Sequence, residues 1–404
     1  MDDGDLTPDT RLVLAPRTRT RREASGHVLV DSPLGPVIDI GPQGHAVLAL
    51  FSDTIALGDA IERLERSHRG VTGFAPTMGA INAMIEEGVL VPDNGSAAPS
   101  SGWTDPIEHS RMLHDDRRTG AFIAALEATV RPGDVVVDVG TGSGVLAVAA
   151  ARAGARHVYA VEATDIAAVA QRVFERNGVQ DRVTLVPGWS RHVELPEQAD
   201  VLVSEVIGNE PLQEEILETT LDARQRLLAP GGRLIPHGLT LLARPIEIPA
   251  AEMHQRVLVP TDVERWRDLY GLDFTPLLAV ASREPVHTLA EGEVAAAWPT
   301  RGPAVELGSL DLARLETPTL DASADLVVDE PGTVNAVAVT FRADLDAAIS
   351  HTLDPWAHPA SSWATSVWVL PEPLSTTPDD RLRVRYRRRV AGIPDGLTCT
   401  LIRP

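Results

Sequence analysis

The sequence predicts a Rossmann-like α/β core with a parallel sheet, followed by a C-terminal β-barrel with a helical arm and preceded by a small α+β winged-helix-like domain. Three observations support this fold class. Strand and helix patterns alternate over residues 106–238, as they do in βαβ units. β-rich segments fill residues 239–404. Two short strands and three helical patterns occupy residues 25–95.

The composition limits what the chain can bind. Its 57 acidic residues and 36 lysine-plus-arginine residues give a net charge of −21, which repels nucleic acid and attracts cationic substrates. No apolar stretch is long enough to span a bilayer and the N-terminus is acidic, so we expect a cytoplasmic protein without a membrane partner. Cys399 is the single cysteine, and no histidine or cysteine cluster has ligand spacing, so no metal site is expected.

The residues before the core are expected to form one small domain. Residues 1–24 are polar and arginine-rich, which predicts disorder. Residues 25–95 contain two strands, three helices and a closing strand, and residues 96–105 are expected to be a linker. The segments of this domain are HVLVDS, GPVIDIG, GHAVLALFS, ALGDAIERLER and MGAINAMIEEGVLVP.

The core and the barrel follow in the same way. VVVDVG, HVYAVE, VTLVPG and ADVLVSE are apolar runs typical of strands, whereas VLAVAAARAGA and DIAAVAQRVFERNG have helical spacing. LAPGGRLIP is predicted to be a helix end that turns into a strand. The later strands are LTLLARPIEI, VNAVAVTFRADL, SVWVL, RLRVRYRRRV and LTCTLIRP, and an arm over about residues 251–284 contains the helical segment TDVERWRDLYG.

A glycine-rich turn, DVGTGSG, links the first core strand to a helix. Gly140, Gly142 and Gly144 would let the backbone approach a ligand closely. Asp138 ends the first strand and Glu162 ends the second, where a carboxylate can accept both hydroxyls of a ribose. No Lys-Ser/Thr pair follows, which disfavours a triphosphate. The pattern fits S-adenosylmethionine better than NAD, with an ordinary strand–turn–helix as the alternative.

An acidic cluster, SEVIGNEPLQEE, follows the last core strand. Like charges about 4 Å apart repel by roughly 4 kcal/mol at an effective dielectric near 20, so a bound cation would stabilise such a cluster. The alternative is a solvated acidic loop.

The chain from Glu108 to Pro404 resembles the protein arginine methyltransferases. The resemblance rests on HSRMLHDDRRT (109–119), on the segment around DVGTGSG, on SEVIGNEPLQEE, on WRDLYGLDF (266–274) and on SSWATSVWVL (361–370). It implies a class I methyltransferase core, S-adenosylmethionine as cofactor, S-adenosylhomocysteine as product, and a homodimer formed through the arm. It also implies that Glu205 and Glu214 clamp a cationic nitrogen in line with the reactive methyl group, whereas Glu210 and Glu215 are bystanders.

The resemblance implies the other site residues one by one. Arg118 would bind the cofactor carboxylate with its planar fork, and Arg191 would lie beside the adenine, where the family usually has a glutamate. The full cofactor-binding set is His109, Met112, Arg118, Asp138, Gly140, Gly142, Gly144, Glu162, Ser190 and Arg191.

Two departures from the family concern the substrate. The aromatic helix with paired tyrosines is not visible before His109, and Trp103 is the aromatic residue expected in its place. The family's Thr-His-Trp loop is Ser361-Ser362-Trp363, although Asp115, the usual partner of that histidine, remains. A guanidinium has a pKa above about 12 and needs more help to react than a primary amine near about 8. These departures therefore predict an amine substrate. The expected substrate-binding residues are Trp103, Asp115, Ser362 and Trp363.

Residues 25–95 resemble PqqD-like domains, which bind the leader of ribosomally made precursor peptides (RiPPs). The resemblance implies that a leader adds as a strand near Val37–Ile40, beside the helix Met78–Ile85. The alternatives are a winged helix that docks DNA or protein, and a structural cap. We therefore expect an N-methyltransferase that methylates an amine, at a peptide terminus, in RiPP maturation of the daptide type. The alternatives are an arginine methyltransferase acting on proteins and a catalytically idle scaffold.

Overall fold

The computed structural model describes residues 7–15, 18–23, 27–32, 36–42, 44–51, 54–67, 71–92, 105–278, 285–388 and 396–403. The chain divides into two compact units, which are described separately. The first unit contains Met1–Ser110, Val130–Ser204 and Gln225–Pro230, and the second contains Arg111–Thr129, Glu205–Arg224 and Gly231–Pro404. Within the described ranges, no helix combines the length and the apolar character that a membrane span requires.

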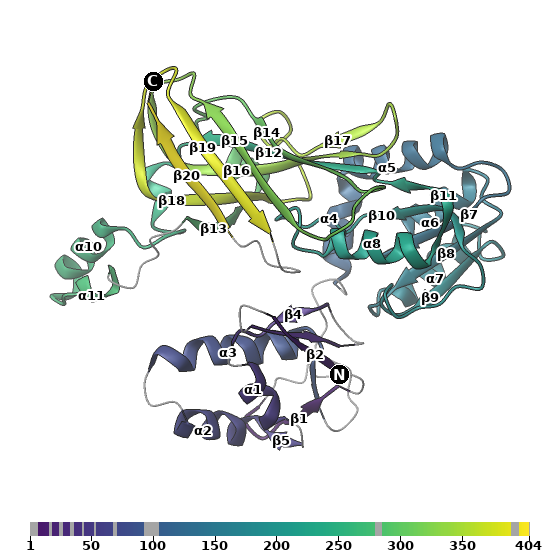
Figure 1. Ribbon diagram of the computed structural model, residues 1–404, viewed down its shortest axis with the longest axis horizontal. Coiled ribbons are helices and arrows are strands. Elements are labelled where there is room, and N and C mark those ends of the chain that lie inside the picture. Colours follow the sequence, from purple (N-terminus) through teal and green to yellow (C-terminus); the bar gives the residue numbers. More distant parts are fainter. Residues whose placement is uncertain are drawn as a thin grey trace. The chain divides into compact units, whose positions relative to one another are not determined.

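The N-terminal module combines two small antiparallel sheets with three helices (Figure 1). One sheet has the order β5-β1-β6 and the other β2-β3-β4. The strands are β1 Arg11–Leu14, β2 Arg19–Arg22, β3 Val28–Asp31, β4 Ile38–Asp39, β5 Ile55–Ala56 and β6 Leu90–Pro92, and the helices are α1 Gly44–Leu50, α2 Leu57–Ser67 and α3 Val71–Glu86. Leu12, Val30, Phe51, Ile81 and Met84 are buried together in its core.

The expectation of disorder over residues 1–24 is wrong where β1 and β2 form. Leu12 is fully buried and pairs with Pro92 of β6, so the short segment RLVL completes the sheet. The predicted pair HVLVDS and GPVIDIG forms β3 and β4, which are antiparallel. Trp103 and most of the predicted linker 96–105 lie outside the described residues.

The first unit also contains a parallel sheet with the order β11-β10-β7-β8-β9. Strands β7, β8, β9 and β10 are parallel, and β7, β8 and β10 are rich in buried valine, as expected for strands covered on both faces. The strands are β7 Val135–Val139, β8 His157–Glu162, β9 Val183–Pro187, β10 Ala199–Ser204 and β11 Leu228–Ile235. The helices of the same stretch of chain are α4 Pro106–His114, α5 Asp116–Thr129, α6 Val145–Arg152, α7 Ala167–Arg176 and α8 Ile216–Arg226, of which α5 and most of α8 belong to the second unit.

One core prediction was wrong in detail. LAPGGRLIP was expected to begin as a helix end, but α8 ends at Arg226 and β11 runs from Leu228 through the glycine pair to Ile235. Gly231 has φ +79, a left-handed conformation that glycine adopts without strain, so the strand continues through the pair.

The second unit is dominated by antiparallel sheets, as the sequence predicts for a barrel region. Its larger sheet has the order β13-β18-β16-β12-β14, with β17 paired to β16, and its smaller sheet has the order β15-β19-β20. The strands are β12 Gly238–Ile246, β13 Val286–Ala290, β14 Val305–Asp311, β15 Leu320–Val327, β16 Gly332–Asp344, β17 Ser350–Thr352, β18 Thr365–Thr376, β19 Arg381–Arg388 and β20 Gly396–Ile402.

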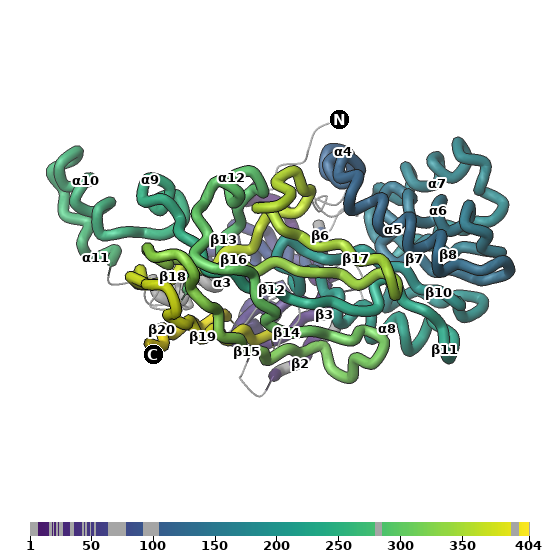
Figure 2. The backbone as a smooth tube through the Cα atoms, turned by 90° about the horizontal axis from the view of Figure 1, so that it is seen from above, coloured from purple at the N-terminus to yellow at the C-terminus, as the bar shows by residue number. Residues whose placement is uncertain are grey.

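A helical arm interrupts this β-rich region, as predicted. It contains α9 Ala250–Met253, α10 Pro260–Tyr270 and α11 Thr275–Leu278, and α12 Gly292–Ala296 follows after β13. Figure 2 shows α10 and α11 projecting from the strands of the second unit. Trp266 of α10 packs edge-on against Phe274, with ring centroids 5.7 Å apart. Leu269, Tyr270 and Leu272 are more than half exposed, so the arm carries apolar surface that its own unit does not cover.

Candidate functional site

A glycine turn in the first unit forms a narrow cradle between β7 and α6. Gly140, Gly142 and Gly144 all have positive φ, at +77, +52 and +89, a region that other residues enter only with strain. A side chain at Gly142 would meet the ring of His109, because an added Cβ would lie 2.9 Å from its Cε1 atom. At Gly144 an added Cβ would lie 2.6 Å from Phe174. The turn is therefore shaped for glycine at these positions, and His109 is buried against it.

Two buried carboxylates flank this turn. Glu162 accepts hydrogen bonds from the Gly142 amide and from both the amide and the hydroxyl of Thr164, all at 2.8 Å. Asp138 is fully buried and accepts a hydrogen bond from Thr141 at 2.5 Å, and burial raises its pKa to about 7. Its second oxygen, Oδ1, has no hydrogen-bond partner among the described residues. Glycine backbone, a strand-end glutamate and an unpaired carboxylate oxygen suit a nucleoside-type cofactor with hydroxyl and amino groups.

Two further cofactor-binding candidates, Ser190 and Arg191, also lie in the first unit. Ser190 and Arg191 are half-buried after β9. The Arg191 guanidinium lies 5.4 Å from the centroid of the Trp189 ring, which is a cation–π distance.

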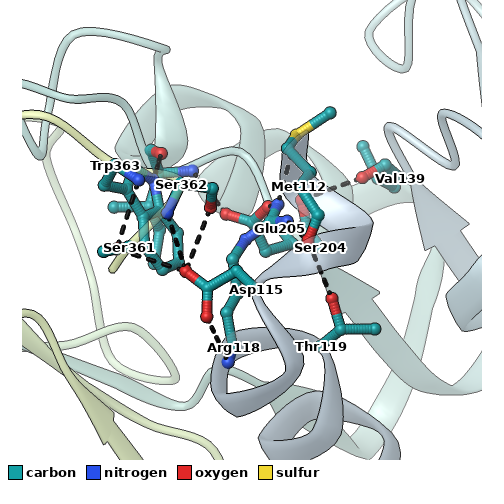
Figure 3. A network of polar contacts seen from close by, with 11 residues as sticks. Met112, Asp115, Arg118, Thr119, Val139, Ser204, Glu205, Ser361, Ser362 and Trp363 are labelled. Carbon is teal, nitrogen blue, oxygen red and sulfur yellow. Dashed lines mark hydrogen bonds and ion pairs between the residues drawn. The ribbon is translucent and has the colours of Figure 1, made fainter. Parts of the chain in front are cut away.

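The second unit holds the acidic loop, which begins with Glu205, the residue directly after β10. Arg118 of α5 forms an ion pair with Glu205, and its guanidinium lies 4.8 Å from the Trp363 ring centroid (Figure 3). Arg118 also contacts Met112, whose carbonyl accepts from it at 3.4 Å. Burial lowers the pKa of Arg118 to about 10, and the nearby Asp115 and Glu214 partly oppose this. Its Nε atom has no partner within the part of the chain that the structure describes.

Glu214 is the second acid that the sequence singled out. It retains some exposed surface, yet burial raises its pKa to about 7, and only the charge of Arg118 opposes this shift. No hydrogen bond to its carboxylate comes from the described residues. The loop is tight here, because a Cβ added to Gly208 would lie 3.3 Å from Glu214 Oε1 and 2.7 Å from the Glu210 carbonyl oxygen. The site thus contains one carboxylate paired with arginine and one that can still accept a donor.

The carboxylate of Asp115 is hydrogen-bonded by the Ser361-Ser362 loop and by α5. Its carboxylate accepts from the Arg118 amide at 3.0 Å, from the Ser362 amide at 2.8 Å, and from the hydroxyls of Ser361 and Ser362 at 3.2 Å (Figure 3). Burial would raise the pKa of Asp115, but the hydrogen bonds from Ser362, Arg118 and Ser361 lower it below its usual value. Trp363 is buried and donates from Nε1 to the Ile207 carbonyl at 2.6 Å.

Sequence reasoning missed two residues of this unit. His351 of β17 is buried with its ring centroid 5.5 Å from that of Trp363, and burial lowers its pKa although the charge of Asp115 opposes this shift. Glu210, interpreted as a bystander, is fully buried and accepts a hydrogen bond from Tyr386. His351 stands in no recognisable motif, and Glu210 stands in the acidic cluster but meets its partner through β19, which lies far away in the sequence.

Comparisons with known proteins agree with this architecture. The family described as ribosomal protein L11 methyltransferase (PrmA) matches residues 116–254. A relative from Arabidopsis thaliana named "Probable protein arginine N-methyltransferase 6" is 34% identical over 273 residues, which cover 63% of this chain and 61% of the relative. "Protein arginine N-methyltransferase 1" of Schizosaccharomyces pombe is 36% identical over 181 residues, covering 44% of this chain and 51% of that protein. The chain thus spans less than two thirds of the length of either relative.

Solved structures give the most complete match. The Trypanosoma brucei PRMT1 enzyme-prozyme heterotetrameric complex with AdoHcy aligns over 74% of this chain and 99% of the solved chain, with a TM-score of 0.63 and 22% identity. Protein arginine methyltransferase 10 of Arabidopsis thaliana aligns over the same shares with a TM-score of 0.59 and 21% identity. The chain therefore has the fold of the protein arginine methyltransferases, in which a Rossmann-like parallel sheet is joined to antiparallel barrel-like sheets.

Proposed function

We propose that this chain is an S-adenosylmethionine-dependent N-methyltransferase. The observation that carries the proposal is the acidic loop, in which Glu205 is paired with Arg118 while the partly buried Glu214 receives no hydrogen bond from the described residues. The names of the relatives support the same activity. The cofactor supplies an electrophilic methyl group on a sulfonium. In the first unit, Glu162 and the glycine turn would hold its nucleoside.

The two glutamates would act on the acceptor nitrogen. Charge-assisted hydrogen bonds from a cationic acceptor group to Glu205 and Glu214 would orient its nitrogen toward the methyl group, and the lone pair that attacks is freed when that nitrogen gives up a proton. Because the pKa of Glu214 is raised to about 7, this residue is suited to take up the proton that the nitrogen releases. The transfer forms one N–C bond, breaks one S–C bond and releases S-adenosylhomocysteine.

The first candidate acceptor is the guanidinium of arginine in a protein. The relatives named above carry this specificity in their names, and the two-acid loop suits a planar cation. The second candidate is a primary amine of a peptide, as in RiPP maturation. The Asp115 site favours this acceptor. Ser361 and Ser362 donate hydrogen bonds to the Asp115 carboxylate, where the arginine methyltransferases would have a histidine beside it.

An assay with methyl-labelled cofactor distinguishes these acceptors. The full chain would be offered an arginine-rich peptide, the same peptide with each arginine replaced by lysine, and a peptide in which only the terminal amine is free. Label on the first peptide alone supports the arginine assignment, and label on the amine peptides supports the second. If no peptide is labelled and S-adenosylhomocysteine does not bind in calorimetry, the chain is a scaffold and the proposal is wrong.

The N-terminal module is proposed to recognise the substrate peptide. β4 lies at the edge of the sheet β2-β3-β4, where an extended segment can add as a further strand. A candidate precursor peptide should then have a KM at least about tenfold lower with its leader than without it. Equal KM values for the two forms would contradict a recognition role.

The cofactor cradle allows a direct prediction for Gly142→Ala. The substitution should weaken S-adenosylhomocysteine binding about tenfold in calorimetry, because alanine in the left-handed region costs roughly 1–2 kcal/mol and its Cβ displaces His109. Gly178→Ala is a matched control, since Gly178 has φ +68 and nothing within 4 Å of its added Cβ. Equal affinities in the two variants would mean that the turn does not hold the cofactor.

A homodimer through the arm is also proposed. The exposed Leu269, Tyr270 and Leu272 would be covered by a second copy of the chain. Light scattering is expected to give twice the chain mass for the wild type and the single-chain mass for Leu269→Asp. The exposed Val169→Asp in α7 is a control for surface charge, and a monomeric wild type would refute the interface.

A further inference from the structure

The acidic loop is attached to the barrel strands of the same unit at three points. Each contact joins a residue between Glu205 and Glu214 to β19 or to the turn before β18. The contacts are Trp363 Nε1 to the Ile207 carbonyl at 2.6 Å, the Ala364 amide to Asn209 Oδ1 at 2.7 Å, and the Tyr386 hydroxyl to Glu210 Oε1 at 2.5 Å. The last contact is the only one of the three that joins two buried polar side chains.

Glu210 is a buried acid that forms no ion pair with the described residues. Its Oε1 accepts from Tyr386, and its Oε2 accepts from the Leu212 amide at 3.1 Å. Burial raises the pKa of Glu210, while these two hydrogen bonds act in the opposite direction. Both Glu210 and Tyr386 have no exposed surface. A buried acid of this kind is costly unless its partners are present, so the Tyr386 hydroxyl is needed to keep the loop in this path.

A second residue of β19, Arg388, contacts the chain after Glu214. Arg388 is fully buried, and it donates to Glu218 of α8 at 2.9 Å and to the Pro318 carbonyl at 2.6 Å. Tyr386 and Arg388 are two residues apart, so they share one face of the strand. Glu210 and Glu218 lie four residues before and four residues after Glu214. One strand face therefore holds the loop on both sides of this acid.

We propose that Tyr386 and Glu210 are positioning residues that hold the acidic loop so that Glu205 and Glu214 can act together. This inference rests on the proposed function for its effect on catalysis. It is otherwise an inference about the loop itself. Because no hydrogen bond from the described residues fixes the Glu214 carboxylate, its place is set by the backbone path. That path is tight at Gly208, where an added Cβ would contact the Glu210 carbonyl oxygen and Glu214.

Hydrogen–deuterium exchange of Tyr386→Phe tests the positioning role without depending on activity. Peptides that cover residues 205–217 should exchange roughly ten to a hundred times faster than in the wild type, because a buried acceptor has lost its donor. Peptides from β7 and β8 should be unchanged. Tyr159→Phe is the matched control, since Tyr159 is also a buried strand tyrosine with its hydroxyl 3.5 Å from a carboxylate, that of Glu197. Unchanged exchange of residues 205–217 in Tyr386→Phe would overturn the proposal.

Kinetics and a second variant separate this role from general stabilisation. In Tyr386→Phe kcat should fall about tenfold with the KM for S-adenosylmethionine unchanged, at a temperature at which the variant is fully folded. Glu210→Gln should give a similar loss, since an amide cannot accept from both Tyr386 and Leu212, and the double variant should lose less than the product of the two single losses. Independent losses would contradict the proposed pairing. If the wild type transfers no methyl group, the proposed function fails, while the exchange experiment still decides the positioning role.

Discussion

Replacing Glu214 by glutamine is expected to lower kcat for methyl transfer by about a thousandfold. The amide keeps the size of the side chain but cannot pair with a cation or take up its proton. Loss of one charge-assisted contact in a desolvated site costs roughly 10²–10³ in rate, and loss of proton transfer adds to this. The variant should still fold and bind S-adenosylhomocysteine, because the glycine turn and Glu162 are unchanged. Single-turnover assays with labelled cofactor would measure the loss.

Two comparisons make this prediction specific. Glu205→Gln should cause a loss of similar size, because Glu205 is the other proposed partner of the cation, and it also removes the ion pair of Arg118. Glu194→Gln, an exposed glutamate after β9, should retain wild-type activity. If Glu214→Gln retains more than about a tenth of the wild-type kcat, Glu214 does not hold the acceptor nitrogen and the proposed mechanism is wrong.

The buried parts of the fold were predictable from local patterns. The strands β7, β8, β10 and β16 are apolar runs, because their side chains are buried in the sheets, and such runs are visible in a short window. The strand β15 was missed because LDASADLV contains polar residues and small side chains. Its hydrogen-bonding partner, β19, lies far away in the sequence, so a short window does not show the pairing. Residues 11–14 were missed because a single buried Leu12 gives too weak a pattern among arginines.

The site was predictable only in its composition. The acidic cluster and the glycine turn stand in continuous segments, so Glu205, Glu214 and Glu162 could be singled out. The partners of the acids could not, because Arg118 meets Glu205, and Ser362 meets Asp115, across long separations in the sequence. Glu210 illustrates this limit of prediction. The acidic cluster contains four glutamates, and the sequence alone does not show which of them is hydrogen-bonded to Tyr386 and which would bind a substrate.

Methyl transfer to an arginine peptide is expected to fall about tenfold for each pH unit below about 7. An arginine keeps its charge over this range, so the pH dependence reports the enzyme. Burial raises the pKa of Glu214 to about 7, and its protonated form cannot hold a cation. At pH 5 and saturating cofactor, kcat/KM should be about a hundredfold below its plateau above pH 8. A profile that is flat from pH 5 to 8 would contradict an ionised Glu214 in the reaction.

The same titration should appear in stability, with the opposite dependence on pH. A carboxyl whose pKa is higher in the folded chain binds more protons there than in the unfolded chain, so the free energy of unfolding falls as pH rises from about 4.5 to about 7. For Glu214 this decline is about 3 kcal/mol, and Asp138, whose pKa burial also raises to about 7, should add its own. Denaturant unfolding of Glu214→Gln should therefore show a shallower decline than the wild type between pH 5 and 7, as should Asp138→Asn. These experiments need no substrate. If the free energy of unfolding of Glu214→Gln declines with pH as steeply as that of the wild type, Glu214 is not the group that titrates, whatever the activity profile.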